Sequence, residues 1–246
     1  DPYNRLAAPS RAHIFGTDEL GRDTFTRILY AGRISLSVAL IVTLLSAVIG
    51  SLIGSISGYL GGKAETVLMR FTDIMLTLPV LPLLMIISKS LREMMWLQRA
   101  LGNLLSVIVL IVVIAAFGWM TMARLVHGSV LSLKNREFME AARALGVSGP
   151  HAITRHLLPN SLAPIVVSST LLFGAVIVYE ATLSFLGLGV QPPTPSWGNM
   201  LTDVQQFMHR NPWLAFYPGL CIFFTVLSIN FIGDGLRDAL DPRLKM

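Results

Sequence analysis

Residues 34–58 read ISLSVALIVTLLSAVIGSLIGSISG and contain no charged side chain. At a rise of about 1.5 Å per residue, a helix of this length crosses the roughly 30 Å hydrocarbon layer of a bilayer. Gly50, Gly54 and Gly58 recur every four residues, which lines up one smooth helix face for close contact with another helix. That second helix could belong to this chain or to a partner subunit. The stretch predicts a transmembrane helix and hence an all-α integral membrane protein.

The composition of the whole chain supports the same class. Of its 246 residues, 53% are hydrophobic and 13% are charged, and the mean hydropathy is +0.65. Soluble domains carry about 25% charged residues, and disordered chains are poor in apolar ones, so both classes are excluded. Cys221 is the single cysteine, which excludes a disulfide scaffold. The net charge of +5 is typical of basic loops beside spans, and no compact basic face indicates nucleic-acid binding.

Four further apolar stretches predict four more spans. The complete set of predicted spans is 34–58, 67–89, 101–123, 162–183 and 213–233. The second is the least regular, because Pro79 and Pro82 should break or kink a helix. It also contains Arg70 and Asp73, which are three residues apart and so either pair with each other or reach the membrane surface. The prediction is a polytopic bundle with five transmembrane helices in this chain.

Three polar segments separate or precede the spans: an arm at 1–33, a hairpin at 134–160 and a loop at 186–212. The arm lacks the apolar core of a signal peptide. The loop carries several prolines, which lack the N–H of a helix and restrict the residue before them. We therefore expect the loop to be ordered but not helical.

The hairpin predicts two short helices. The first runs over Lys134–Leu145 and ends at Gly146, a residue suited to a left-handed helix cap. The second is expected over about 148–158, with Pro159 as its stop signal. The segment carries no nucleophile or metal-ligand set, so it is predicted to be a mechanical element that moves the spans attached to it.

A motif in the hairpin resembles a known family. It reads Glu140-Ala141-Ala142, three residues, Gly146, nine residues, and then His156-Leu157-Leu158-Pro159. This is similar to the EAA loop of ABC-type importer permeases, whose pattern is EAA, three residues, G, nine residues, I-x-L-P. Every position matches except the isoleucine, which is His156 here.

Other segments resemble the C-type subunit of dipeptide, oligopeptide and nickel permeases in that family. They are HIFGTDELGRD at 13–23, LSFLGLGVQPP at 183–193 with SWG at 196–198, and GDGLRDALDP at 233–242. The connection at 88–103 is longer and more charged than is usual in the family. Members usually have six spans, so the resemblance implies a further span before the arm.

The resemblance implies a fold of the type I ABC importer permease kind, with residues 34–246 as the transmembrane permease domain. It places the chain in the cytoplasmic membrane of a bacterium or archaeon as a multi-pass protein. The arm and the 186–212 loop would be extracytoplasmic, and the hairpin would be a cytoplasmic coupling loop. With this orientation, ten of the 19 Lys and Arg residues lie inside, so charge bias does not set the orientation.

The resemblance also implies which residues couple the permease to its ATPases. They are Glu140, Ala141, Ala142, Gly146, His156, Leu158 and Pro159. We expect Glu140 to hold the loop through a local ionic or hydrogen-bonding contact. Ala141 and Ala142 would permit close packing, and Gly146 would permit the turn.

The partners implied are a second homologous permease subunit, two ABC ATPase subunits, an extracytoplasmic solute-binding protein and the lipid bilayer. The chain itself has no P-loop, because its one Gly-Lys pair, Gly62-Lys63, is preceded by Ser57 where the motif needs glycine. We therefore expect no cofactor on this chain, with ATP and Mg bound by the partners. Its five histidines are scattered, and His151 and His156 lack the i, i+4 spacing of a helical metal pair, so no metal is assigned.

Glu180 is the one acid deep in a predicted span, which makes it a candidate for the transport pathway or an outer gate. The alternative is an acid that nearby backbone or a loop satisfies.

A competing class, an intramembrane serine protease, needs a base within reach of its serine. Ser57-Gly58 lacks the usual G-x-S-G pattern, and no histidine lies in a predicted span core. A third class, a channel or secondary transporter, would transport its solute without an ATPase. The sequence does not identify the cargo, which could be a peptide, a metal chelate or another solute.

Overall fold

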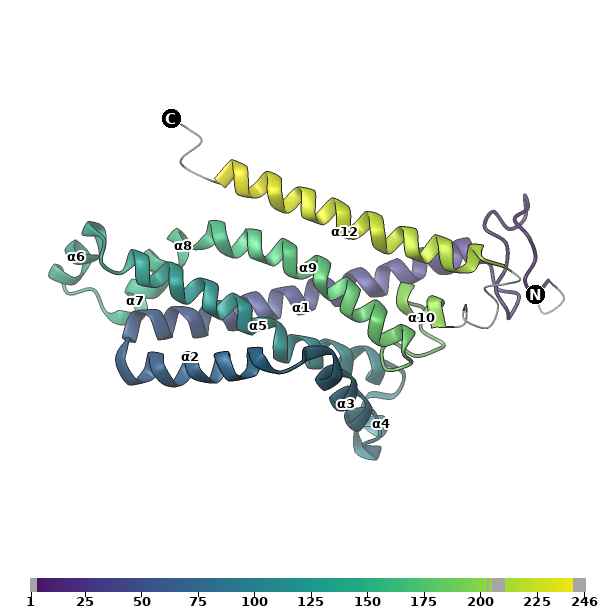
Figure 1. Cartoon of the computed structure of the whole chain (residues 1–246), viewed down its shortest axis with the longest axis horizontal. Coiled ribbons are helices and arrows are strands. Elements are labelled where there is room, and N and C mark those ends of the chain that lie inside the picture. Colours follow the sequence, from purple (N-terminus) through teal and green to yellow (C-terminus); the bar gives the residue numbers. More distant parts are fainter. Residues whose placement is uncertain (1–3, 203, 205–210, 241–246) are drawn as a thin grey trace. The chain divides into compact units, whose positions relative to one another are not determined.

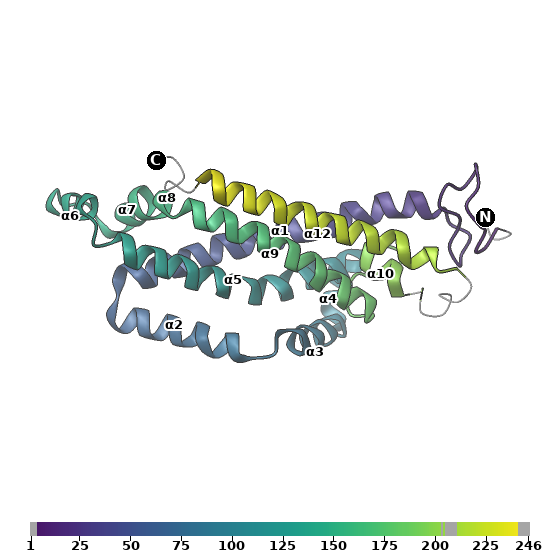
Figure 2. The same cartoon turned by 45° about the horizontal axis from the view of Figure 1, so that its top comes forward.

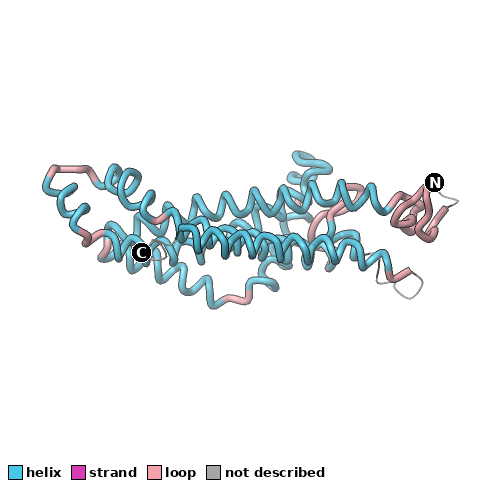
Figure 3. The backbone as a smooth tube through the Cα atoms, turned by 90° about the horizontal axis from the view of Figure 1, so that it is seen from above, coloured by secondary structure: helices cyan, strands magenta, loops and turns pink. Residues whose placement is uncertain are grey.

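A computed structural model describes residues 4–202, 204 and 211–240, and helices make up most of this part of the chain (Figure 1, Figure 3). In chain order the helices are α1 Thr24–Leu60, α2 Gly62–Thr77, α3 Val80–Arg92, α4 Met95–Leu101, η1 Gly102–Leu104, α5 Leu105–Leu133, α6 Glu137–Ala144, α7 Gly149–Ala152, η2 Ile153–Leu157, α8 Leu158–Asn160, α9 Leu162–Phe185, α10 Trp197–Thr202 and α12 Trp213–Leu240. Among the described residues, β-pairing is limited to an isolated bridge between Thr17 and Asp23. The predicted all-α fold is confirmed.

Within the described residues, four helical stretches are long and apolar enough to cross a membrane. They are α1, the α4–α5 stretch Met95–Leu133, α9 and α12. The pair α2 and α3 passes the same test only as a broken span. The five predicted spans therefore correspond to four long helical stretches and one interrupted pair.

The second predicted span, 67–89, is interrupted at Leu78. This residue has extended backbone, with φ −76° and ψ 140°, because a following proline disfavours the helical region. The helix is interrupted between α2 and α3 at this point (Figure 2). Pro79 thus breaks the helix, whereas Pro82 lies in the first turn of α3, where its missing N–H has no helical partner.

Several helices extend beyond the predicted spans. α1 begins at Thr24, within the predicted arm, and α5 continues to Leu133 although its span was predicted to end at 123. A run of uncharged residues indicates the part of a helix that lies in the hydrocarbon layer. The helix itself continues beyond that layer for as long as its backbone hydrogen bonds continue. Polar residues such as Arg27 and His127 therefore lie in the same helices as the apolar runs.

The chain forms two compact units, each built from three separate segments. The first unit comprises Asp1–Ile41, Leu81–Ile114 and Gly174–Ser228, and the second comprises Val42–Val80, Ala115–Phe173 and Ile229–Met246. In the first unit, Trp197 is buried with Ile28, Ala31 and Met200. The core of the second unit joins α5 to the hairpin and α9.

In the second unit, the glycine face of α1 packs on α5. A Cβ atom added at Gly54 would lie 2.4 Å from the carbonyl oxygen of Ala123, and Cβ atoms at Gly50 and Gly58 would lie 2.6 and 2.9 Å from side chains of the same helix. Only glycine permits this approach of two helix backbones. The contact predicted from the glycine spacing is therefore made within this chain.

We predict that Gly54→Ala destabilises the protein, because the new methyl group must displace the α5 backbone. Overpacking of this kind costs about 1–3 kcal/mol. Gly128→Ala is the matched control, since no atom lies within 4 Å of a Cβ added there and alanine is the better helix former. Thermal unfolding of the purified protein measures both variants, and equal midpoints for the two would contradict the assigned packing.

Candidate functional site

The hairpin 134–160 turns at Gly146, which follows the end of α6. Its φ of 77° confirms the predicted left-handed cap. The N–H of Val147 donates to the carbonyl of Ala142, and the N–H of Gly146 donates to that of Arg143. This is the paired hydrogen-bond pattern of a Schellman cap, which satisfies carbonyls left open at the helix end.

The second half of the hairpin does not stop at Pro159 as predicted. Residues Ile153–Leu157 form a π-helix, and the N–H of Leu158 donates to the carbonyl of Ile153. Pro159 lies in the first turn of the next helical segment, α8. Backbone N–H groups in a first turn have no partner within the helix, so the missing N–H of proline costs no hydrogen bond there. The helical path therefore continues to Asn160 and enters α9 after Ser161.

One face of the hairpin belongs to the core of the second unit. Met139 of α6 is buried together with Ala152 and Leu157 against residues of α5 and α9, and Ala142, three residues further on, is buried as well. Leu158 packs at the edge of the same cluster. Ala142 is thus buried, and its part in coupling stays a prediction.

The hairpin is also tied to the end of α1. The Lys134 ammonium donates to the carbonyl of Gly58 over 2.9 Å, and the Arg143 guanidinium donates to the carbonyl of Lys134 over 2.7 Å. A Cβ atom at Gly149 would lie 3.0 Å from the Tyr59 ring, so the second half of the hairpin also rests on α1. A displacement of the hairpin would therefore be passed to the helices that hold it.

The opposite face of α6 is exposed and apolar. Phe138, Ala141 and Leu145 follow one another at helical spacing, with Phe138 39% and Leu145 85% exposed. Ala141 does not pack within the described chain, unlike Ala142. The Glu140 carboxylate is exposed as well, and no ion pair or side-chain hydrogen bond joins it to another described residue. Its local contact stays a prediction.

The end of the predicted motif has a mixed environment. His156 is half-buried and its ring centroid lies 6.2 Å from that of His151. Pro159 is exposed. No group of three His, Cys, Asp or Glu side chains could hold a metal within the described part of the chain, and His209 lies outside that part.

Glu180 lies on α9 in the first unit and is fully buried. Its carboxylate accepts hydrogen bonds from the hydroxyls of Ser35 and Ser184, both at 2.8 Å. The Ser35 oxygen in turn accepts from the N–H of Trp197, and that of Ser184 accepts from the N–H of Val190. The two serines connect the buried acid to the backbone of the following loop. The geometry therefore supports the alternative in which a loop satisfies the acid.

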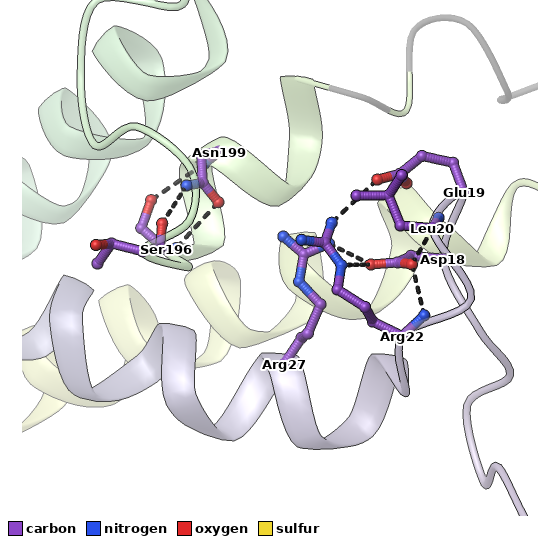
Figure 4. Close-up of polar contacts among 8 residues, drawn as sticks. Asp18, Glu19, Leu20, Arg22, Arg27, Ser196 and Asn199 are labelled. Carbon is purple, nitrogen blue, oxygen red and sulfur yellow. Dashed lines mark hydrogen bonds and ion pairs between the residues drawn. The ribbon is translucent and has the colours of Figure 1, made fainter. Parts of the chain in front are cut away.

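The loop after α9 packs closely on the helices of the first unit. The Trp197 indole donates to the carbonyl of Ile28 over 3.1 Å, and a Cβ atom at Gly198 would lie 2.6 Å from the Cα of Ala181. Ser196 and Asn199 exchange side-chain to backbone hydrogen bonds at the start of α10, the arrangement of a capping box (Figure 4). The SWG segment is thus ordered, as predicted, but the expectation that this loop is not helical is wrong, because α10 begins at Trp197.

The arm is organised around the buried carboxylate of Asp18 (Figure 4). It accepts from the guanidinium groups of Arg22 and Arg27 at 2.7 and 2.6 Å and from the backbone N–H groups of Leu20 and Arg22. Burial alone would raise the pKa of Asp18, but these donors and the two positive charges outweigh burial and hold the pKa below its ordinary value. The carboxylate is therefore ionised and holds the arm in place.

A polar cluster at the end of α1 was not predicted. The Ser57 hydroxyl lies 2.9 Å from Nδ1 of His127, and Nε2 of His127 lies 3.3 Å from the Glu65 carboxylate. The order of groups matches a hydrolase triad, but Ser57 is fully buried and its hydroxyl also lies 3.0 Å from the Gly54 carbonyl oxygen. No substrate reaches it, so the cluster joins α1, α2 and α5. His127 lies outside the predicted span core at 101–123, in the part of α5 that continues beyond it to Leu133.

The two charged residues of the second predicted span do not pair with each other. Asp73 instead forms an ion pair with Arg124 of α5 at 3.0 Å. Both side chains are about half exposed, so the pair contributes little to stability. Arg70 was a possible partner of Asp73 because the two are neighbours on one helix. The structure instead places α5 beside α2 in the second unit, and Arg124 of α5 is the partner.

The fold defines a class of protein: a helical protein with several helices long and apolar enough to cross a membrane. A family model for the inner membrane component of binding-protein-dependent transport systems matches residues 50–246, and the chain belongs to this family.

Relatives with high identity cover the whole chain. The dipeptide transport system permease protein DppC of Alkalihalophilus pseudofirmus is 45% identical over 245 residues, which is 100% of this chain and 77% of the relative. A putative peptide permease protein of Brucella suis is 43% identical over 98% of this chain and 76% of its own. The glutathione transport system permease protein GsiD of Escherichia coli O6:K15:H31 is 41% identical over 100% and 77%.

Solved structures share the fold at low identity. A chain of the MetNI methionine ABC transporter, in an inward-facing conformation, superposes with a TM-score of 0.69 at 18% identity, covering 88% of this chain and 97% of that one. A crystal structure of an amino acid ABC transporter gives a TM-score of 0.58 at 15% identity over 88% and 95%. The predicted permease fold is confirmed.

We predict that Glu180→Leu lowers the unfolding midpoint, because the hydroxyls of Ser35 and Ser184 lose a buried acceptor, at about 1–3 kcal/mol for each unsatisfied group. Glu180→Gln keeps the size and one acceptor oxygen and should lose less. Thermal unfolding and solute uptake are measured on both. If Glu180→Leu retains the wild-type midpoint yet abolishes uptake, the structural role is wrong and the residue belongs to the transport pathway.

We predict that the stabilising effect of Asp18 depends on pH. Its pKa is lower in the folded chain than in the unfolded one, so its contribution is complete above the ordinary aspartate pKa of about 3.9 and is lost as pH falls through the folded value. The difference in unfolding midpoint between wild type and Asp18→Asn should shrink over that range. Asp73→Asn serves as a half-exposed control with a small difference throughout. A difference that grows on acidification contradicts the assignment.

Proposed function

We propose that this chain is the membrane-spanning permease subunit of an ATP-driven importer that carries peptides across the cytoplasmic membrane of a bacterium or archaeon. Family membership supports the transport role, and the relatives named for dipeptide, peptide and glutathione transport support the cargo class. The chain contributes the passage and no ATP hydrolysis. Nothing in its sequence provides a P-loop for nucleotide.

The observation that carries this proposal is the two-faced hairpin 134–160. Its Met139 and Ala142 face is part of the core, whereas Phe138, Ala141 and Leu145 are presented outward from the same helix. An apolar helix face of this kind fits a groove on a partner protein. We assign the partner as a cytoplasmic ABC ATPase, with the exposed Glu140 available to a basic group of that subunit.

Coupling would follow from the attachment of the hairpin. Nucleotide-driven closure of two ATPase subunits would displace the hairpin, and its ties to Gly58 and to the core on α5 and α9 would carry the displacement into the spans. Binding energy then shifts the permease between two conformational states. ATP and Mg would reside on the ATPases, with no cofactor or metal on this chain.

The complete assembly would contain a second homologous permease subunit, two ATPases and an extracytoplasmic solute-binding protein in a lipid bilayer. In this orientation the hairpin is cytoplasmic, and the arm and the 186–212 loop face outward. The test is co-purification of the chain with its ATPases and measurement of peptide-stimulated ATP hydrolysis in liposomes. Peptide uptake that proceeds without ATPase subunits would favour a channel or secondary transporter and overturn the proposal.

We predict that Leu145→Asp uncouples the importer without unfolding the permease. Leu145 is largely exposed, so the change should leave the unfolding midpoint intact, whereas a charge at a central apolar contact should reduce ATPase association about tenfold or more. Ile14→Asp, at an exposed apolar residue of the arm, is the matched control and should keep association unchanged. Normal co-purification of Leu145→Asp with the ATPases would rule out this docking face.

A further inference from the structure

A cavity of about 660 Å³ with polar and apolar lining lies in the first unit, at the end of α3 and against the loop that follows α9. Its volume is within the range of small-molecule sites, roughly 300–1,000 Å³. The cavity is separate from the Glu180 network and from the hairpin. The residues that provide its polar lining are Lys89, Arg92, Glu93, Gln98, Asn103 and Gln191.

Two cations, Lys89 and Arg92, contribute to the lining of the cavity. Lys89 and Arg92 are three residues apart in the last turn of α3, so they share a helix face. The Arg92 guanidinium donates to the carbonyls of Gly187 and Gly189 at 3.0 and 3.2 Å. Those carbonyls satisfy hydrogen bonds but do not neutralise the charge, and no ion pair within 4.0 Å involves Lys89 or Arg92 in the described part of the chain.

An acid lies in the same lining. Glu93 is exposed and is four residues from Lys89, the spacing at which helical ion pairs form. No such pair within 4.0 Å is made among the described residues, although the backbone N–H of Glu93 donates to the carbonyl of Lys89 and continues the helical hydrogen bonds. The charge of Glu93 acts on its neighbour Arg92, although no ion pair within 4.0 Å joins the two among the described residues, and the cavity lining carries groups of both signs.

The cavity wall is held in place by hydrogen bonds within the unit. The Gln191 side-chain amide donates to the carbonyls of Gly187 and Gly189, and its backbone N–H donates to the Ser106 hydroxyl. The Gln98 amide donates to the carbonyl of Arg92 over 2.7 Å. A site with its walls already formed loses less conformational freedom when a ligand binds.

We propose that this cavity binds the free peptide as a zwitterion, with the terminal carboxylate beside Lys89 and Arg92 and the terminal ammonium facing Glu93. The inference rests on the proposed function and adds to it a contact between this subunit and its cargo. The lining carries charges of both signs, as a free peptide does. Charge-assisted hydrogen bonds supply selectivity for free termini over blocked ones.

A purely structural role explains part of the same arrangement. Cations in the last turn of a helix stabilise its C-terminal end, and Arg92 anchors the loop through Gly187 and Gly189. Neither effect distinguishes a peptide with a free carboxylate from its amide. Lys89 is the better residue to test, since its side chain is exposed and its removal leaves the Arg92 anchor intact.

The experiment uses the complete permease–ATPase assembly in nanodiscs without the solute-binding protein. Calorimetric titration compares dialanine with its C-terminal amide and its N-acetyl derivative. Dialanine should bind about tenfold or more tightly than either blocked form. Lys89→Gln should weaken the binding of dialanine by a similar factor and leave the affinity for the amide unchanged. Glu93→Gln should weaken the binding of dialanine and leave the affinity for the N-acetyl form unchanged.

Arg99→Gln is the matched control, because Arg99 is an exposed cation of α4 that does not line the cavity. It should leave all three affinities at the wild-type values. Three results would each overturn the cavity proposal. They are equal affinity for free and blocked peptides, equal effects of Lys89→Gln and Arg99→Gln on the affinity, and no binding up to millimolar peptide. Wild-type peptide uptake with the binding protein present is measured in parallel. If uptake is normal, only the cavity proposal fails, whereas absent uptake and absent ATPase stimulation mean that the proposed function fails.

Discussion

A polar group removed from water must find its partner inside the protein, and this requirement governs the structure. In hydrocarbon, an unpaired backbone group costs several kcal/mol, so spanning segments are helical. The same rule applies to side chains within those helices. Glu180 is surrounded by serine hydroxyls, and Ser57 lies against His127. The few polar residues of the apolar stretches thereby become fixed contacts between helices.

Pairing of buried groups also orders the loops. The serines that bind Glu180 accept hydrogen bonds from Trp197 and Val190, so the segment after α9 is held against the helices of the first unit. In the arm, Asp18 plays the corresponding part with Arg22 and Arg27. Segments that look like connections in the sequence are therefore rigid surfaces, suited to contact with a partner protein or a solute.

The hairpin 134–160 combines two requirements in one short helix. Residues three apart on α6 anchor it in the core, and the residues between them are presented outward. Gly146 has a left-handed backbone conformation, which glycine adopts without strain. The chain therefore turns directly after α6, and the hairpin is short. The hairpin is thus tied to the helices beneath it through its buried face and through the Lys134 contact to Gly58.

The sequence by itself determined the helical membrane class, the approximate spans, the hairpin and the left-handed turn at Gly146. These follow from local properties: apolar length, charge position, and the backbone preferences of glycine and proline. Only the tertiary structure decided that the Gly54 face meets α5, that Asp73 pairs with Arg124, and that Arg92 anchors the loop after α9. Such contacts join residues far apart in the chain, and their partners depend on how the helices are packed. The periodicity of one helix shows which face is buried, but it carries no information about the residue that lies opposite.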